Sequence, residues 1–433
     1  MKISSRLNLN IISLQLFATI GLSLITTSLL SQSQEVKKGW NFGPLPAISY
    51  NSDLGFQYGA LCDIFWFGNG SQYPEYLHKF NVEISQYTKG SGVYHLFYDS
   101  RYLIPGLRVT ADVSYLTDRM MDFYGFNGYL SPYSPNHGDA FYKFDRNLFR
   151  STIDIQGALG GNFSWVAGIG FYGYKAASVK LKKYEEDLKL YDLYIASGII
   201  GANEKKGGNV AEVKLGAVYD TRDNEADPYK GFKAELLTLY SLVAGGGDNY
   251  GKAFISASGF IPFWRDKLTF AAKGSWQGTI YGEQPFYMLQ NISTLYYRQI
   301  TNEGLGGINT VRGVLRNRVV GAGIAWANIE LRYRFAYFPF LGQSWYLVLN
   351  PFFDAGRVVQ YHKKEAMQLT SDNFPHTNSN FLYNGDKEAL HMSAGLGFKA
   401  VMNRNFIISA EWGKPFDKRD GTNGFNIGLN FIF

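Results

Sequence analysis

The sequence predicts an all-β fold, a 16-stranded antiparallel transmembrane β-barrel. Many segments of strand length alternate apolar and polar residues. Aromatic residues make up 17% of the chain against 18% for charged residues, and no apolar run of membrane-spanning length follows residue 33. Soluble domains carry about 25% charged residues, and a spanning helix needs about 20 mostly apolar residues in a row. A barrel accounts for all three observations, because every second side chain faces lipid and the others face a polar lumen.

The first 33 residues have the order of a secretory signal peptide. Lys2 and Arg6 give a positive start, an apolar stretch covers 11–30, and small and polar residues follow at 31–34. This order predicts a signal peptide over 1–33. A membrane-anchoring helix is the alternative, since the stretch approaches spanning length, but its glutamine and hydroxyl residues favour export. An exported barrel is expected in the outer membrane of a Gram-negative bacterium.

The cysteine count and the net charge limit the other possible classes of protein. Cys62 is the only cysteine, so no internal disulfide is possible, and we interpret it as an ordinary strand residue. The net charge of +6 is mild, and the one short basic cluster, at 180–183, is interpreted as a solvated loop. Nothing here supports a nucleic-acid partner. The expected surroundings are outer-membrane lipids.

Strict alternation marks the strands, because successive strand side chains face opposite sides of a sheet. The last segment sets Phe425, Ile427, Leu429, Phe431 and Phe433 against Asn426, Gly428 and Asn430. Another sets Ile329, Leu331, Tyr333 and Phe335 against Asn328, Glu330, Arg332 and Arg334. In a soluble protein the apolar face would line a core. In a barrel it meets lipid, and the polar face lines the lumen.

Strands are predicted at 43–50, 54–66, 78–88, 92–102, 106–116, 146–159, 162–178, 210–221, 231–244, 248–261, 266–281, 321–335, 344–357, 389–402, 404–413 and 424–433. These sixteen make an even number, as in single-chain bacterial barrels. A soluble two-sheet protein would rarely use sixteen strands in one domain.

The connections between these strands alternate in length. The long ones are 117–145, 179–209, 282–320 and 358–388, and the short ones include 159–162, 262–265, 336–343 and 402–404. All four long connections fall on one side if the chain starts in the periplasm. Long extracellular loops and short periplasmic turns are the expected asymmetry. The connection 67–77 is longer than this scheme requires.

Two local motifs are specific. Residues 215–223 read Leu-Gly-Ala-Val-Tyr-Asp-Thr-Arg-Asp and precede Pro228 and Gly231, which suit a polar periplasmic turn. Residues 306–314 read Gly-Gly-Ile-Asn-Thr-Val-Arg-Gly-Val and fall between the eleventh and twelfth strands. Both resemble the Omp85 superfamily of outer-membrane barrels, the BamA- and TamA-like or bacterial surface antigen D15-type proteins.

The resemblance implies a loop-6 lock, made of Arg312, Gly313, Glu330 and Asp354. In the family the sixth extracellular loop folds into the lumen, and its arginine meets acidic residues on strands twelve and thirteen. By position, Arg312 would pair with Glu330 and Asp354. A planar guanidinium can engage carboxylates with two parallel bonds. Val314 stands where the family has an aromatic residue. This difference bears on the packing of the loop tip more than on the role of the arginine. The alternative is that Arg312 is a solvated loop arginine.

The C-terminal segment matches a pattern of outer-membrane barrels in general. Asn426, Gly428, Phe431 and Phe433 fit the polar-x-Gly-x-x-aromatic-x-aromatic signal by which barrel-assembly machinery recognises its clients. This signal supports the class of protein rather than the family. We expect Phe433 to close the last strand against the first one, near Pro46.

The resemblance implies a part in outer-membrane protein assembly, insertion or translocation. Family members of this type carry periplasmic POTRA domains, but strand-like sequence begins here at 43–50, soon after the predicted cleavage site. Residues 34–433 are therefore expected to form an Omp85-type barrel of a POTRA-less branch. Client outer-membrane proteins, accessory periplasmic proteins or a second copy are the expected partners. The alternative is a passive pore or structural barrel without client handling.

An enzyme is not expected, and neither is a cofactor or a metal. The histidines, at 78, 95, 137, 362, 376 and 391, lack metal-ligand spacing, and no nucleophile elbow or phosphate-binding loop is present. The glycines within 243–248 are interpreted as a tight loop between strands. A barrel lipase that assembles Ser and His from distant strands is the remaining enzymatic alternative.

Overall fold

The computed structural model describes residues 36–433, except 74, 185, 246, 265–266, 295–302, 341–342, 374–380 and 405. The predicted signal peptide and His376 lie outside the described residues. The strands are β1 (Trp40–Pro46), β2 (Ser49–Asn51), β3 (Gly55–Trp66), β4 (His78–Tyr87), β5 (Ser91–Ile104), β6 (Leu107–Asp122), β7 (Lys143–Gly160), β8 (Phe163–Ala177), β9 (Asn209–Asp220), β10 (Gly231–Ala244), β11 (Tyr250–Trp264), β12 (Leu268–Tyr281), β13 (Gly323–Phe340), β14 (Gln343–Gln360), β15 (His391–Met402), β16 (Phe406–Pro415) and β17 (Gly424–Leu429).

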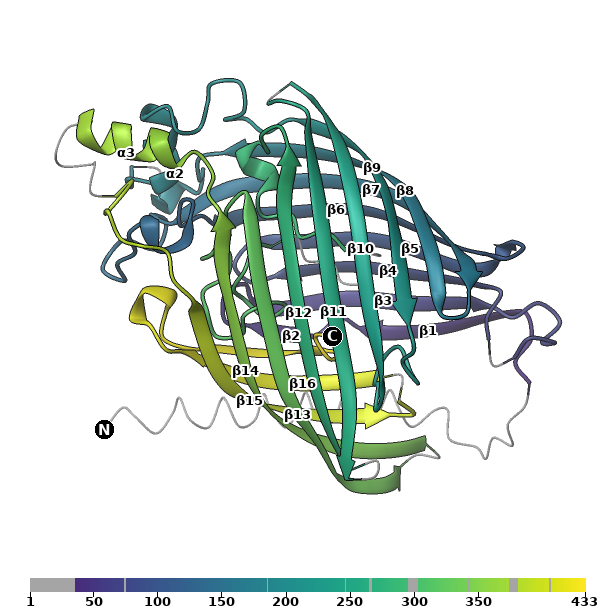
Figure 1. Cartoon of the computed structure of the whole chain (residues 1–433). Coiled ribbons are helices and arrows are strands. Elements are labelled where there is room, and N and C mark those ends of the chain that lie inside the picture. The colour runs from purple at the N-terminus through teal and green to yellow at the C-terminus, as the bar shows by residue number, and fades with distance from the viewer. Residues whose placement is uncertain are drawn as a thin grey trace, which may run out of the picture.

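These strands form one closed antiparallel barrel (Figure 1). Both β1 and β2 pair with β3, so they make up a single first strand that is interrupted at Ala47 and Ile48. Each later strand pairs with the next along the chain, and β17 returns to pair with β2. The ring therefore has sixteen positions, which confirms the predicted fold. Cys62 lies in β3, as predicted.

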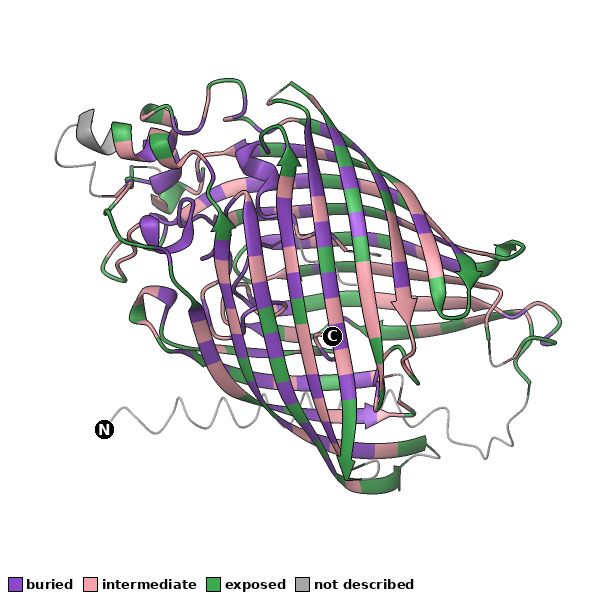
Figure 2. Cartoon of the chain, viewed as in Figure 1, coloured by how far each residue is buried: buried purple, intermediate pink, exposed green. Residues whose placement is uncertain are grey.

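The alternation of the strands separates a lipid face from a lumen face. On β13, Ile329 and Phe335 are 40% and 45% exposed, whereas Glu330 and Arg334 are fully buried. Figure 2 shows the same banding along neighbouring strands. Since the apolar side chains face outwards and the charged ones face the lumen, the barrel is inverted relative to a soluble β protein.

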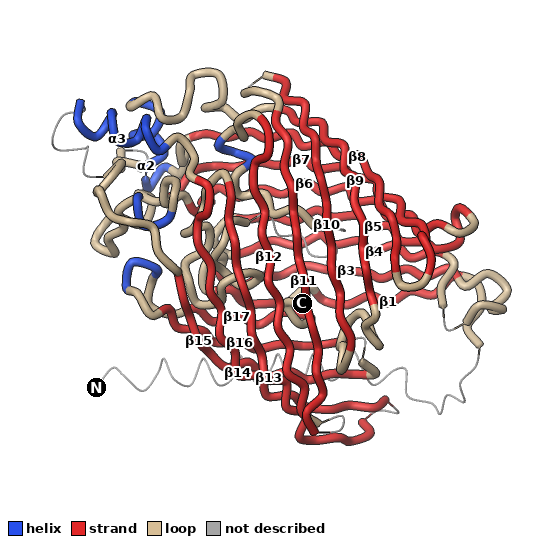
Figure 3. The backbone as a smooth tube through the Cα atoms, in the orientation of Figure 1, coloured by secondary structure: helices blue, strands red, loops and turns tan. Residues whose placement is uncertain are grey.

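The long loops gather at one end of the barrel, here called the long-loop end (Figure 3). They span 123–142, 178–208, 282–322 and 361–390 between the bounding strands, and they carry the helices α2 (Leu190–Ala196) and α3 (Lys364–Asn373). Aromatic side chains from these loops pack into a common core, which includes Phe123, Tyr194 and Phe286. We call this packed assembly the loop layer. No helix among the described residues is long and apolar enough to cross a membrane.

The last strand is shorter than predicted. β17 ends at Leu429, and Asn430 has a left-handed backbone with φ of 69°. Asn is one of the few residues that tolerate this conformation, and the turn rotates the following side chains to the other face. Phe431 is consequently 5% exposed and lies inside the barrel, so the predicted lipid-facing placement of Phe431 and Phe433 is wrong.

Candidate functional site

Loop 6 joins β12 to β13 over residues 282–322, and its described segment 303–322 folds back into the barrel and places Arg312 in the lumen. The Arg312 guanidinium donates to both carboxylate oxygens of Asp354 on β14, from Nε at 2.8 Å and from Nη2 at 2.9 Å. The backbone N–H of Arg312 donates to the same carboxylate at 3.0 Å, and Nη1 donates to Glu330 on β13 at 2.6 Å. The structure thus brings together the arginine and the two carboxylates that the resemblance implied.

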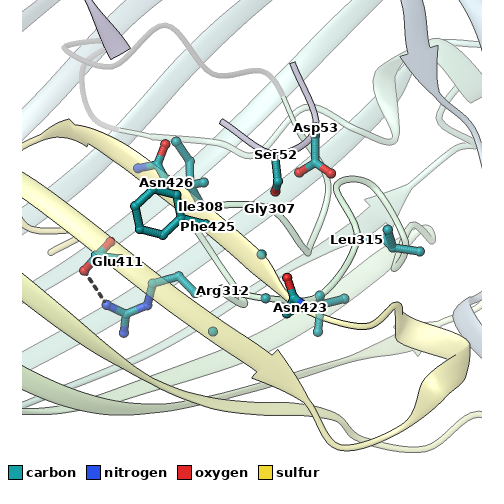
Figure 4. Close-up of a pocket in the computed structure, with 14 residues that line it drawn as sticks. Ser52, Asp53, Gly307, Ile308, Arg312, Leu315, Glu411, Asn423, Phe425 and Asn426 are labelled. Atoms are coloured by element: carbon teal, nitrogen blue, oxygen red, sulfur yellow. Dashed lines mark hydrogen bonds and ion pairs between the residues drawn. The ribbon is translucent and has the colours of Figure 1, made fainter. Parts of the chain in front are cut away.

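A third carboxylate, which the sequence analysis missed, meets the same arginine. Glu411 on β16 accepts from Arg312 Nη1 at 3.0 Å (Figure 4). The guanidinium carbon also lies 3.6 Å from the ring centroid of Phe352, a cation–π contact. Alternation along β16 would have placed Glu411 on the lumen face, but no motif in the sequence links it to Arg312.

Two further cations complete a buried charge cluster. Arg332 Nε donates to Glu330 at 2.9 Å, and Lys399 Nζ donates to Glu411 at 2.9 Å. The lumen charge cluster, as we call it, consists of Arg312, Arg332, Lys399, Glu330, Asp354 and Glu411. A buried ion costs several kcal/mol unless it is paired, and here three cations balance three carboxylates. This pairing fixes where the tip of loop 6 lies.

Glycines let the loop tip approach the last two strands. Gly313 has φ of 89°, a conformation that favours glycine. A Cβ on Gly413 of β16 would lie 2.8 Å from the carbonyl oxygen of Arg312, and one on Gly424 of β17 would lie 3.2 Å from Cα of Gly313. Three backbones therefore meet where only hydrogen atoms fit.

A small pocket lies beside this glycine contact (Figure 4). Loop 6, β16, β17 and the turn that holds Ser52 and Asp53 line it. Burial, with the Asp122 carboxylate adding to it, raises the pKa of Asp53 to about 6. The pocket shows that the loop tip, the first hairpin and the last strand meet at one place.

The barrel closes through a short seam. β17 pairs with β2 at two positions, Asn426 with Asn51 and Ile427 with Tyr50, whereas β16 and β17 pair at six. Among the described strands β1 pairs with β3 alone, so its other edge has no neighbour in the sheet. Pro44 and Pro46 sit in β1 and donate no backbone hydrogen bond. The predicted closure of Phe433 against Pro46 is therefore wrong, and the seam lies nearer the long-loop end.

The family follows from comparison with known domains. The model of the Omp85 superfamily domain matches residues 77–433. This chain belongs to the Omp85 superfamily. A search of curated protein sequences gave no significant match. Membership of this family, together with the barrel, points to the bacterial outer membrane.

Two solved structures resemble this Omp85 barrel. BamA from Haemophilus ducreyi lacking POTRA domains 1–3 has a TM-score of 0.57 and 18% identity, with 91% of this chain and 71% of that chain covered. CdiB from Escherichia coli has a TM-score of 0.55 and 9% identity, with 91% and 63% covered. At these identities the likeness concerns the fold.

The predicted C-terminal signal is divided between two places in the Omp85 barrel. Asn426 and Gly428 lie on β17, where they pair with β16. Phe431 and Phe433 lie in the lumen after the turn at Asn430. The role of these residues as an assembly signal stays a prediction.

Two more arginines of loop 6, which the sequence analysis also missed, anchor it to β6 and to other loops. Arg316 donates to Asp118 at 2.7 Å and to Asp122 at 2.8 Å, both near the end of β6. Arg318 donates to backbone oxygens of Gly128, Ser131 and Arg419. Arg316 therefore binds loop 6 to the end of β6, and Arg318 binds it to the loop 123–142 and to the turn between β16 and β17, so loop 6 is anchored at other points besides its tip.

The histidines are dispersed through the structure. His95 bonds Asp112 at 2.6 Å in the lumen, and His391 bonds Asp420 at the same distance near the long-loop end. Within the described part of the chain, no group of three or more His, Cys, Asp or Glu residues could hold a metal ion.

Proposed function

We propose that this barrel takes part in the assembly, insertion or translocation of outer-membrane proteins through its seam. The observation that carries the proposal is the two-pair seam beside the unpaired edge of β1. An unpaired edge presents backbone N–H and C=O groups to which another strand can pair. Family membership supports the same general role. Its partners would be outer-membrane lipids, client proteins and accessory periplasmic proteins.

A disulfide across the seam tests this proposal. Tyr50 and Ile427 are paired neighbours whose side chains are partly exposed on the lipid side. Y50C and I427C, introduced with C62S, would form a bond that holds β2 to β17. We expect the oxidised protein to lose the ability to restore outer-membrane proteins after depletion of the wild type, and reduction to return it.

The matched control is I169C with V213C, a paired couple on β8 and β9, away from the seam. Oxidising this pair should leave the outer-membrane proteome unchanged. If the seam disulfide also leaves the proteome unchanged, or if depletion removes only the uptake of one solute, the passive-pore alternative is favoured.

We also propose that Arg312 acts as the lock that holds loop 6 in the lumen. R312A would leave Glu330, Asp354 and Glu411 without their shared cation. Removing one partner of a buried ion pair costs about 3–5 kcal/mol. We expect protease to cleave loop 6 much faster in R312A than in R119A, which removes an exposed arginine. Equal cleavage and unchanged function in the two variants would contradict the lock.

A further inference from the structure

The turn 221–230 between β9 and β10 folds inwards across the end of the barrel opposite the long loops, here called the short-turn end. Its own polar groups brace it, because Asp223 accepts from the backbone N–H groups of Tyr229 and Lys230 at 2.9 and 3.1 Å. Ala226, at its middle, packs against a cluster of luminal side chains from β14, β15 and β16. The turn is therefore an ordered element that reaches into the lumen.

One side of the turn is fixed to β13, β14 and the turn between β15 and β16. The fully buried Asp227 carboxylate accepts from Arg334 on β13 at 2.7 Å and from the hydroxyl of Tyr346 on β14. The ring of Tyr229 stacks against two guanidiniums, whose carbons in Arg334 and Arg404 lie 3.8 and 4.0 Å from its centroid. Arg404 also donates to the backbone oxygen of Asp227 at 2.9 Å. Breaking a buried ion pair leaves a charge uncompensated, so this side is held strongly.

The other side of the turn meets β5 and β6 through Glu225. Its carboxylate lies 3.0 Å from Arg108 Nη1 on β6 and 3.5 Å from Arg101 Nη2 on β5. The side chains of Glu225 and Arg101 are 39% and 55% exposed. Exposed ion pairs contribute little to stability and are screened by salt. Asp99 holds Arg108 with two parallel bonds of 2.8 and 2.7 Å, so this arginine stays on the wall when the Glu225 carboxylate leaves.

The two walls that the turn contacts lie across the lumen from each other. In the ring, β7 to β12 separate β6 from β13 on one side, and β17, β1/β2, β3 and β4 separate β16 from β5 on the other. The strands β9 and β10, from which the turn projects, lie between the two walls. Contacts with both walls therefore place the turn across the mouth of the barrel, strongly bound at one wall and weakly bound at the other.

The part of the lumen between this turn and loop 6 holds charged side chains that water reaches. Lys233 pairs with Glu235 on β10 at 2.7 Å, and Lys79 on β4 pairs with Asp63 on β3 at 3.0 Å. These four side chains are between 13% and 28% exposed, whereas no side chain of the lumen charge cluster exceeds 5%. This part of the lumen is therefore less tightly filled than the part around the loop tip, and we call it the vestibule.

We propose that the turn 221–230 is a hinged lid over the vestibule. It stays bound to β13, β14 and the turn between β15 and β16, and it moves away from β5 and β6 when the ion pairs of Glu225 break. The open lid admits small polar solutes to the vestibule from the short-turn end, and the closed lid excludes them. The lid is separate from the seam, and the inference does not depend on the role proposed for the seam.

Thiol labelling measures access to the vestibule. The reporter is E235C in the full chain with C62S, which makes it the single cysteine. A small membrane-impermeant maleimide should label this parent protein slowly when it is folded in lipid nanodiscs. E225A should raise the labelling rate about fivefold, as the loss of a partly exposed ion pair allows. The matched control E186A removes an exposed glutamate at the long-loop end and should leave the rate unchanged.

Charge reversal and salt test the same ion pairs in two further ways. E225R should label faster than E225A, because the new arginine is repelled by Arg101 and Arg108. Adding R101E to E225R rebuilds a pair with opposite signs and should bring the rate back towards that of the parent protein. In the parent, whose turn is unaltered, about 1 M salt should also accelerate labelling, because the Debye length falls to about 3 Å.

Heat-dependent mobility on gels verifies that each variant is folded, and protein unfolded in urea gives the labelling rate of an unhindered thiol. A folded parent that labels at the unfolded rate would show an open mouth and overturn the lid. Equal rates in E225A and E186A would overturn it too, as would a parent rate that salt leaves unchanged or an E225R rate that R101E does not restore.

Discussion

Buried arginines set the position of loop 6, because each of them bonds oxygens on strands or loops that lie far from it in the chain. Arg312 and its carboxylates Glu330 and Asp354 could be paired from motif positions. Glu411 could not, because it lies 99 residues away on a strand that is not adjacent to β13 or β14. Alternation tells which face a residue occupies, but not which residues of distant strands meet across the lumen. Arg316 and Arg318 belong to no motif at all.

The close contact at Gly413 predicts that adding a single methyl group there displaces the tip of loop 6. G413A would add a Cβ at 2.8 Å from the Arg312 carbonyl oxygen, so the loop tip would have to withdraw from β16. Overpacking of this kind costs about 1–3 kcal/mol. We expect faster proteolysis of loop 6 and a lower urea midpoint for unfolding.

The matched control for that substitution is G274A on β12, where an added Cβ would meet nothing within 4 Å. Both variants place alanine in a strand of the same barrel. If G274A lowers the midpoint as much as G413A, the close approach of loop 6 is not the cause.

Among the elements, strands were more predictable than their ends. The sixteen predicted segments overlap the observed ring positions, because lipid on one side and polar lumen on the other impose a strict period of two. The break between β1 and β2 was not predicted. It is a small interruption, because the backbone N–H of Ala47 still donates to the carbonyl oxygen of Gly59 at 3.0 Å. The end of β17 was not predicted either. The left-handed backbone of Asn430 turns the following side chains from the lipid face to the lumen, and the alternation of apolar and polar residues in the sequence does not reveal this turn.

One buried histidine gives the loop layer a pH dependence that can be tested. His362 lies between β14 and α3, its ring packs edge-on against Phe126, and its backbone exchanges hydrogen bonds with Asn127. Burial, with Lys363 adding to it, lowers the pKa of His362 from 6.5 to about 3. The folded loop therefore holds a neutral ring over a pH range in which the unfolded loop holds a charged one.

The sign of the effect follows from proton uptake. Between pH 6.5 and 3 the unfolded state binds one more proton than the folded state. The contribution of neutral His362 to the stability of the folded loop layer is therefore complete above pH 6.5 and is lost as the pH falls. At pH 5 the free energy of unfolding of the loop layer is lower by about 2 kcal/mol than above pH 6.5. Hydrogen exchange in 123–142 and 361–369 should accelerate from pH 7.5 to pH 5 more in the wild type than in H362F, after correction for intrinsic exchange rates. An equal change in both proteins would contradict this assignment.

At the scale of the whole molecule, loops and turns fill a barrel that the strands alone would leave open. Loop 6 crosses the lumen to reach β14 and β16, the loop layer packs above it, and the turn 221–230 lies at the opposite end with Phe431. Alternation could predict a polar lumen, but not its contents, because lumen contacts join segments far apart in the chain. The passive-pore alternative requires a conducting path past all of these segments.

Conductance distinguishes a filled barrel from a pore. In a planar bilayer we expect the wild type to show little steady current. Leu305 and Val319 already form an antiparallel bridge, so a Gly-Gly turn can replace 306–318 without separating the flanking backbones. That variant loses Arg312 together with the loop tip and should conduct more often and at higher levels, while heat-dependent mobility on gels verifies that the barrel is folded. A wild type that conducts as steadily as the variant would favour the pore, because the folded-in loop would then not obstruct the lumen.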